Sequence, residues 1–289
     1  MKGFFLISTE HFEDALWFRD DEDFVVGMNY VAIEAFLHKG ILVVAFVLMS
    51  NHVHFILFGE WEDVEKFVSG FKGRYAHYYH NKYGTFKLLK NNKVDVEELE
   101  FGDGHFERGV AYVLMNCVAA NICAHPSQYP WGSGNCYFRP VKPSGRRLGD
   151  FSVRERRKML HSTEDSLPLE WIVSEKGYIL PDNYVGIKAV ESRFKSPQRM
   201  NYFLNNSSKA KKRLSSEDAI PSFRDQVILH VLPDLIRSLF QKASFQELTE
   251  EERTECLRQI RYRFSADITQ AARVCGISYS EAARLIDKY

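Results

Sequence analysis

The pattern of apolar and polar positions in the first part of the chain predicts a strand, a helix and two further strands. Gly3–Ser8 is an apolar run typical of a strand, and Asp21–His38 has acids in its first turn and apolar residues at helical spacing. Ile41–Met49 and Val53–Phe58 are rich in β-branched and aromatic residues. Only the polar pair Ser50-Asn51 separates them, so we expect two adjacent antiparallel strands.

The pattern continues with two helices and a less regular stretch between them. Glu62–Tyr83 has its apolar and aromatic residues on one broad face, and Gly84 favours a helix end after it. A further strand is expected at Phe86–Leu89 or at Lys93–Val96, and a third helix at Phe106–Ile122. This order of elements predicts an α+β fold with a ferredoxin-like antiparallel sheet and helices packed on it.

Composition divides the chain into three stretches. Residues 1–140 contain the predicted sheet. Residues 141–221 have few periodic segments beyond Trp171–Leu180 and many basic or polar residues, so we expect an extended connector with some local structure. Apolar residues return at helical spacing from Ser222, which predicts an all-α region over residues 222–289.

Bulk properties indicate a packed cytosolic protein. The 289 residues, 45% of them apolar, suffice for two domains with separate cores. The longest apolar run, Ile41–Met49, is far shorter than the roughly 20 residues of a membrane helix. Met1–Ser8 leads straight into polar sequence, unlike a signal peptide, so we expect a cytoplasmic protein with no membrane partner. The five cysteines contain no CxxC pair and suggest neither a disulfide framework nor a zinc ribbon.

Charge is balanced overall but uneven along the chain. The 38 basic and 38 acidic residues give a formal net charge of zero, which argues against a protein that coats duplex DNA. Basic residues cluster in Arg139–Lys158 and in Ser192–Ser216. Each run fits either phosphate binding or a solvated loop, and the sequence leaves both interpretations open.

A His-x-His pair is the first candidate for chemistry. His52 and His54 lie at the start of a predicted strand, and the two-residue period of a strand places both rings on one face. Such a pair can chelate one metal ion. By itself it is more often a pair of hydrogen-bonded sheet residues, so the surrounding sequence must decide.

Four segments follow one another in the first half of the chain, namely FVLMSNHVHFIL (46–57), FKGRYAHYYHNKYG (71–84), AYVLMNCVAANI (111–122) and YPWGS (129–133). In this order they resemble REP-associated tyrosine transposases, which belong to the insertion-sequence-200-like, single-tyrosine HUH group. The resemblance covers about the first half of the chain.

The resemblance implies a metal-dependent single-stranded DNA endonuclease and strand transferase. In such an enzyme Tyr112 would attack a scissile phosphate, leaving a 5′-phosphotyrosine and a free 3′-OH. His52 and His54 would hold Mg²⁺ or Mn²⁺, although imidazole ligation alone suggests zinc or manganese. Asn116 is the candidate third ligand, because it lies four residues after Tyr112 on the same predicted helix face. The expected partner is a hairpin or repeat end, and both monomers and homodimers occur in the group.

The helix before the tyrosine helix is the candidate DNA-binding element. Basic and aromatic side chains alternate on it, as in surfaces that stack bases and neutralise phosphates; we single out Lys72, Arg74, Tyr75, His77 and Lys82. The alternative is an amphipathic helix with a solvated basic side. For Tyr112 itself, the alternative is an aromatic residue on the core face of its helix.

The C-terminal segment Asp267–Tyr289 resembles the helix-turn-helix of Fis-like bacterial regulators. Its second helix would bring Arg284 to DNA. A plain helical hairpin used for packing or dimerisation is the alternative.

The sequence also departs from the transposase pattern. It has Asn116-Cys117-Val118-Ala119 where an Asn-Pro-Val-Arg-like run is usual, and acids where a basic stretch is usual between Tyr83 and Tyr112. Two rival functions therefore stay open. One is a non-catalytic or domesticated DNA-binding regulator that retains the HUH fold, and the other is a metal-dependent phosphodiesterase that uses water.

Overall fold

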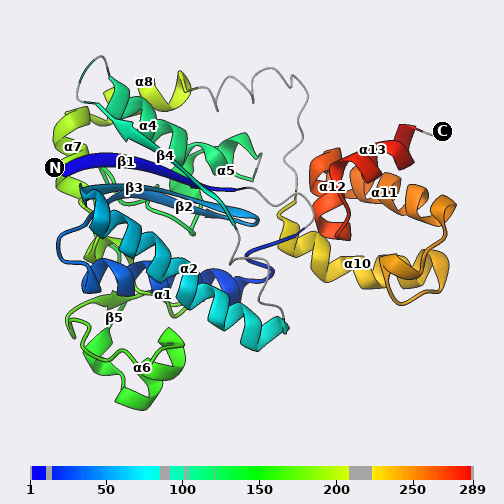
Figure 1. The fold of residues 1–289 in the computed structure, drawn as a ribbon, viewed down its shortest axis with the longest axis horizontal. Coiled ribbons are helices and arrows are strands. Elements are labelled where there is room, and N and C mark those ends of the chain that lie inside the picture. Colours follow the sequence, from blue (N-terminus) through cyan, green and yellow to red (C-terminus); the bar gives the residue numbers. More distant parts are fainter. Residues whose placement is uncertain are drawn as a thin grey trace.

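The centre of the molecule is a four-stranded antiparallel sheet with strand order β2-β3-β1-β4 (Figure 1). The computed structural model describes residues 2–10, 15–84, 92–100, 102, 104–120, 122–207 and 223–287. The strands are β1 (Lys2–Thr9), β2 (Leu42–Met49), β3 (His52–Glu60) and β4 (Val94–Leu99). The predicted α+β class and the antiparallel pair around Ser50-Asn51 are confirmed. Of the two stretches predicted for a further strand, Lys93–Val96 overlaps β4, and Phe86–Leu89 lies outside the described residues.

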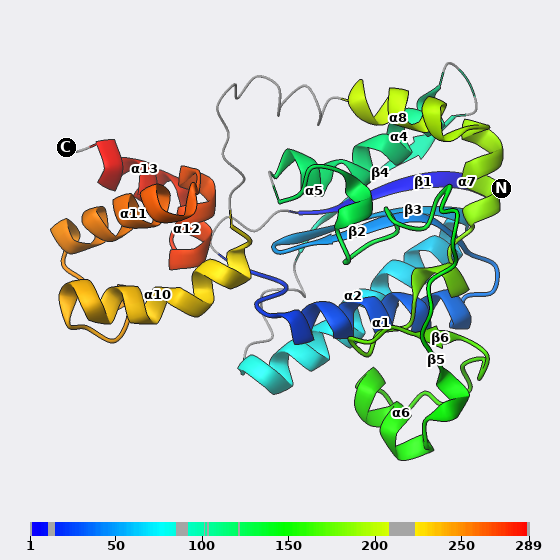
Figure 2. The ribbon, with the colours of Figure 1, turned by 180° about the vertical axis from the view of Figure 1, so that it is seen from behind.

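Helices cover both faces of this sheet. They are α1 (Asp21–Leu37), α2 (Trp61–Tyr83), α4 (His105–Leu114) and α5 (Asn116–Ala119). Helices α1 and α2 lie on one face, and α4 and α5 lie on the other (Figures 1 and 2). Because both faces are covered, β2 and β3 are buried almost throughout, which explains why their sequences are uninterrupted apolar runs.

The predicted single helix over Phe106–Ile122 is wrong, because two shorter helices meet at Met115. The Asn116 amide donates hydrogen bonds to the carbonyl oxygens of Tyr112, at 2.9 Å, and Val113, at 3.2 Å. Asparagine competes in this way with the backbone bonds of a helix. The helix period of the sequence continues across the break and does not reveal it.

The extended connector expected for residues 141–221 is wrong over most of the described part of that range. Its elements, with the short 3₁₀ turn that precedes them, are η1 (Pro126–Gln128), β5 (Arg146–Arg147), η2 (Leu148–Asp150), α6 (Val153–Leu160), β6 (Ile172–Val173), η3 (Pro181–Asn183), α7 (Ile187–Phe194) and α8 (Pro197–Asn205). Leu160, Val190 and Phe194 are buried in the same core as the sheet. Helix α8 packs on α4, and the Gly186 N–H donates to the Val43 carbonyl of β2 at 2.8 Å. Residues 208–221 lie outside the described residues, and the domain boundaries stay a prediction.

The C-terminal region is helical, as expected. It consists of α10 (Asp225–Phe240), η4 (Phe245–Glu247), α11 (Glu250–Phe264), α12 (Ile268–Cys275) and α13 (Tyr279–Asp287). Leu257, Ile260, Ala272 and Leu285 belong to a second apolar core, separate from that of the sheet. Within the described ranges, no helix has the length and apolar content needed to cross a membrane.

Candidate active site

Strand β3 places two imidazoles side by side. The ring centroids of His52 and His54 lie 4.8 Å apart, with the ring planes at 84°. Both residues are buried beneath the face that α4 covers. The expectation that both rings lie on one face of the strand is therefore confirmed, whereas their predicted role as metal ligands is a separate question.

Each ring is oriented by an oxygen atom at Nδ1. In the strand register Ser8 of β1 is opposite His54, and its hydroxyl lies 2.7 Å from His54 Nδ1. The Asn51 side-chain oxygen lies 2.8 Å from His52 Nδ1. Oxygen partners of this kind fix the orientation and tautomer of histidines that bind metal ions through the opposite nitrogen. Ser8 was not singled out in the sequence, because only the register between β1 and β3 brings it to His54.

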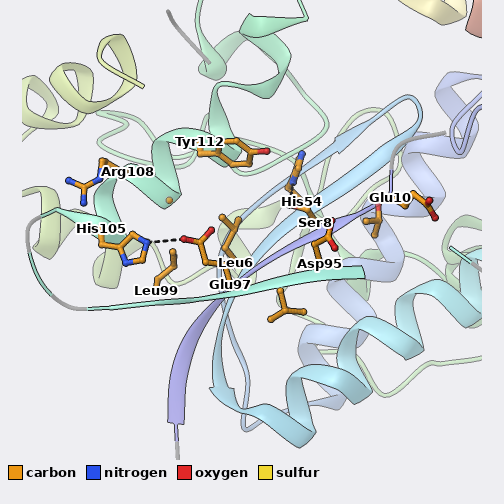
Figure 3. A pocket seen from close by; sticks show the side chains of 13 residues that line it. Leu6, Ser8, Glu10, His54, Asp95, Glu97, Leu99, His105, Arg108 and Tyr112 are labelled. Atoms are coloured by element: carbon orange, nitrogen blue, oxygen red, sulfur yellow. Dashed lines mark hydrogen bonds and ion pairs between the residues drawn. The ribbon is translucent and has the colours of Figure 1, made fainter. Parts of the chain in front are cut away.

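Helix α4 brings Tyr112 to the histidine pair. Its ring centroid lies 5.5 Å from that of His54, with the planes at 83°. The phenol is half-buried and its hydroxyl points toward the His54 ring (Figure 3). Burial, and secondarily the Glu97 carboxylate, raise the pKa of the Tyr112 phenol. The tyrosine chosen from the sequence is therefore not enclosed in the apolar core but lies at the edge of a cavity.

Asn116 lies at the start of α5, where it is buried. Its amide nitrogen donates to carbonyl oxygens at the end of α4. Among the described residues, its hydrogen bonds go to this helix end and to neither imidazole. Its amide oxygen is the atom through which it would bind a metal ion.

A cavity of about 610 Å³ opens beside Tyr112 and His54 (Figure 3). Three acids line it, namely Glu10, Asp95 and Glu97, together with His105 and Arg108. Its remaining lining residues are Leu6, Ser8, Thr9, Val96, Leu99 and Gly109. His52 and Asn116 are not part of this lining.

The sequence analysis did not select the charged residues of the cavity. His105 Nε2 lies 3.0 Å from Glu97 Oε1, which joins the start of α4 to β4. Arg108 is one helical turn before Tyr112, and this i, i+4 spacing is a signal that could have identified it. The acids on β4 could not be assigned to the site before its pairing with β1 was known.

The DNA-binding role predicted for α2 is not supported by the structure. This helix lies on the sheet face opposite to α4 and Tyr112 (Figures 1 and 2). The prediction is wrong for Tyr75, which is fully buried and donates its hydroxyl to the Trp17 carbonyl at 2.5 Å. His77 is exposed, 3.1 Å from the Asn81 amide.

The cations predicted to bind DNA have partners within the protein. Lys72 donates to the Asn92 carbonyl, and burial lowers its pKa. Arg74 pairs with the buried Glu34. Lys82 forms ion pairs with Asp20, Glu22 and Asp23. Arg284 of α13 pairs with Glu250. The charges of Arg74, Lys82 and Arg284 are therefore compensated locally, although Arg284 remains half exposed.

Comparisons with known proteins add one distant likeness. No family model matches the chain, and the search of curated proteins found no match. One solved structure, a REP-associated tyrosine transposase bound to a REP hairpin, is 15% identical and aligns over 60% of this chain and 93% of its own length, with a TM-score of 0.36. At this level the likeness is limited to part of the fold.

Proposed function

We propose that this protein is a metal-dependent single-stranded DNA endonuclease and strand transferase of the transposase type, with Tyr112 as its nucleophile. The observation that carries the proposal is a row of three neighbouring rings, each nearly perpendicular to the next. The Tyr112 ring lies 5.5 Å from that of His54, which lies 4.8 Å from that of His52. A phenol beside two imidazoles at the edge of a cavity is a suitable arrangement for nucleophilic attack on a phosphodiester.

The reaction follows from the chemistry of the phenol. Tyr112 loses its proton to solvent in the cavity, and its oxygen forms a bond to phosphorus. The bond from phosphorus to the 3′ oxygen breaks, and this oxygen takes up a proton from solvent, giving a 5′-phosphotyrosine and a 3′-OH. Another 3′-OH reverses the step and joins the strands, because the phosphotyrosine retains the energy of the phosphodiester.

The donor set fits a hard or borderline divalent ion. His52 and His54 would bind it through Nε2, since oxygen atoms face Nδ1 of both rings. The described residues contain no cluster of three His, Cys, Asp or Glu suited to a metal, so an amide oxygen, that of Asn116, is our candidate for the third ligand. When bound, Mg²⁺ or Mn²⁺ would polarise the phosphate oxygens.

The fold assignment and the partner belong to the same proposal. The strand order is β2-β3-β1-β4, and α1 connects β1 to β2 while α2 connects β3 to β4. This topology supports a ferredoxin-like sheet of the HUH type. We infer that the substrate is single-stranded, such as a hairpin or repeat end, and that Arg108, which lines the same cavity as Tyr112, contacts one of its phosphates. Helices α12 and α13, joined at Gly276 with φ of 69°, would form the helix-turn-helix that adds duplex binding or self-association.

A second candidate is a DNA-binding regulator that retains this fold without catalysis. The three acids that line the cavity favour it, because they repel the phosphates that a nuclease must hold there. A regulator would instead bind DNA through its helix-turn-helix.

Covalent capture of DNA tests the proposal. A 5′-labelled and a 3′-labelled hairpin oligonucleotide are incubated with the full chain and Mn²⁺ or Mg²⁺. We expect an adduct that resists denaturation and carries the 3′ label, because the fragment downstream of the cut is the one bound to Tyr112 through its 5′-phosphate. The adduct should be lost in Tyr112→Phe and retained in the control Tyr202→Phe, whose ring is exposed. Cleavage that survives Tyr112→Phe and yields no adduct would establish water as the nucleophile, and DNA binding with neither cleavage nor adduct would establish the regulator.

A further inference from the structure

The turn before β3 controls the orientation of His52. The Ser50 carbonyl accepts hydrogen bonds from the N–H groups of Trp17, at 2.8 Å, and Phe18, at 3.1 Å. The next residue, Asn51, places its side-chain oxygen 2.8 Å from His52 Nδ1. Ser50, Asn51 and His52 are all buried. A displacement of this turn would therefore move the atom that orients the His52 ring.

One buried carboxylate joins this turn to the C-terminal helices. Asp225, the first residue of α10, is 4% exposed and accepts a hydrogen bond from the Ser50 hydroxyl. It also accepts from Arg273 Nε at 2.8 Å and from the Gln270 amide at 2.9 Å, both on α12. Both views show the start of α10 beside the β2–β3 hairpin (Figures 1 and 2).

The electrostatics make this junction sensitive to both of its sides. A buried carboxylate is unfavourable unless charged and polar partners compensate it. The carboxylate of Asp225 pairs with Arg273 of α12 and accepts a hydrogen bond from Ser50, in the turn before β3. A movement of either α12 or this turn therefore changes the partners of Asp225.

We propose that Asp225 is a positioning residue that couples α12 to the His52 ring, so that binding events at the C-terminal helices and at the histidine pair influence each other. The inference rests on the proposed function, because it assumes that the histidine pair binds a metal ion. Coupling of this kind is reciprocal.

A double-mutant cycle in the full chain tests the coupling. The variants are Asp225→Ala, Ser50→Ala and the double variant, and the control is Asp234→Ala, which removes an exposed carboxylate from the same helix. Mn²⁺ affinity is measured by electron paramagnetic resonance without DNA. The tautomer of His52 is measured in the metal-free protein by ¹H–¹⁵N NMR of the imidazole nitrogens.

We expect each single change to weaken Mn²⁺ binding by about tenfold, the lower end of the effect of losing a partner of a metal-bound histidine. We also expect a smaller fraction of the His52 tautomer that carries its proton on Nδ1. The double variant should bind Mn²⁺ no more weakly than the single variant with the lower affinity. Asp234→Ala should match the wild type. Ser50→Ala keeps the Asp225–Arg273 pair and gives the same test where Asp225→Ala does not fold.

Additive effects in the cycle, or an unchanged His52 tautomer in both single variants, would overturn the coupling. If the wild type binds no Mn²⁺, the tautomer alone decides. A missing Tyr112 adduct would overturn strand transfer without affecting these measurements, so the two failures are distinguishable.

Discussion

Among the single residues of the site, Tyr112 holds its proton more tightly than an ordinary tyrosine does. Burial is the main cause of its raised pKa, and the Glu97 carboxylate is the second. In the proposed reaction the phenolate is the attacking form, so activity should be lost as pH falls below this pKa. Glu97→Gln removes the carboxylate's contribution and should lower the pKa, which shifts the acid limb of the rate profile to lower pH.

The measurement is the pH dependence of adduct formation. Glu98→Gln is the matched control, because strand alternation points this exposed neighbour away from the cavity. An acid limb that stays in place in Glu97→Gln would mean that the phenol proton does not limit the rate.

Ser8 is expected to act on the metal through His54. Ser8→Ala removes the hydroxyl that lies 2.7 Å from His54 Nδ1, so the ring loses a partner that fixes its tautomer. We expect Mn²⁺ affinity to fall by about 10- to 100-fold, measured by calorimetry. Ser69→Ala, on the exposed side of α2, should have no effect. Equal affinities for the two variants would argue against His54 as a ligand.

Arg74 is expected to contribute to stability and not to DNA affinity. Its guanidinium lies 2.5 Å from Glu34, which is 2% exposed, so Arg74→Ala leaves a buried carboxylate beside the His38 imidazole at 3.1 Å. We expect a loss of about 2 kcal/mol in urea unfolding, less than for a fully buried pair because Arg74 is one-third exposed.

The control for Arg74 is Lys66→Ala, which removes an exposed pair with Asp63 on the same helix and should change stability by less than about 0.5 kcal/mol. Oligonucleotide affinity, measured by fluorescence anisotropy, should be the same in both variants. A selective loss of DNA affinity in Arg74→Ala would instead support α2 as a DNA-binding helix.

At the scale of elements, the position of α4 depends on its close approach to β4. A Cβ atom at Gly109 would meet Leu99 Cδ1 at 2.7 Å, so Gly109→Ala should push the helix of Tyr112 away from the sheet. We expect a loss of about 1–3 kcal/mol in unfolding, with weaker adduct formation. Gly73→Ala on α2 meets nothing within 4 Å and should stabilise the protein by about 0.5–1 kcal/mol. A neutral Gly109→Ala would show that α4 adjusts freely.

The elements that the sequence predicted well are those whose period is long and uninterrupted. Helix α1 and strands β2 and β3 were expected nearly at their observed bounds, because burial of whole faces produces a regular pattern. The break at Met115 was missed, since it depends on how one amide bonds to the backbone. Helices α7 and α8 were missed because each has few buried positions, such as Val190 and Met200, and too few to establish a period.

The residues of the candidate site that are close in sequence could be predicted together, whereas those that only strand pairing brings together could not. His52 and His54 were expected to share a face from their spacing alone. Ser8 and Glu97 depend on the pairing of β1 with β3 and β4, which joins residues far apart in sequence. Tyr75 was wrongly assigned to DNA because its aromatic pattern is the same for a core face and for a stacking surface.

At the scale of the whole molecule, the balanced charge limits how DNA can bind. The formal net charge is zero, and Arg74, Lys82 and Arg284 are paired within the chain. We expect the logarithm of the affinity for a single strand to fall with the logarithm of salt concentration with a slope of about −2 or shallower, as for about three neutralised phosphates. Anisotropy titrations over a range of salt concentrations measure this slope. A much steeper slope would mean that the protein neutralises more phosphates than this.

The place of β4 at the end of the sheet order has a consequence for solubility. A terminal strand offers its backbone groups to any extended segment that approaches, which is a common start of aggregation. Here Asp95, Glu97 and Glu98 are three of the six residues of that strand. If β4 of a second molecule paired along it, carboxylates would lie against carboxylates. These acids, of which Asp95 and Glu97 also line the cavity, therefore disfavour association of two molecules through their sheet edges.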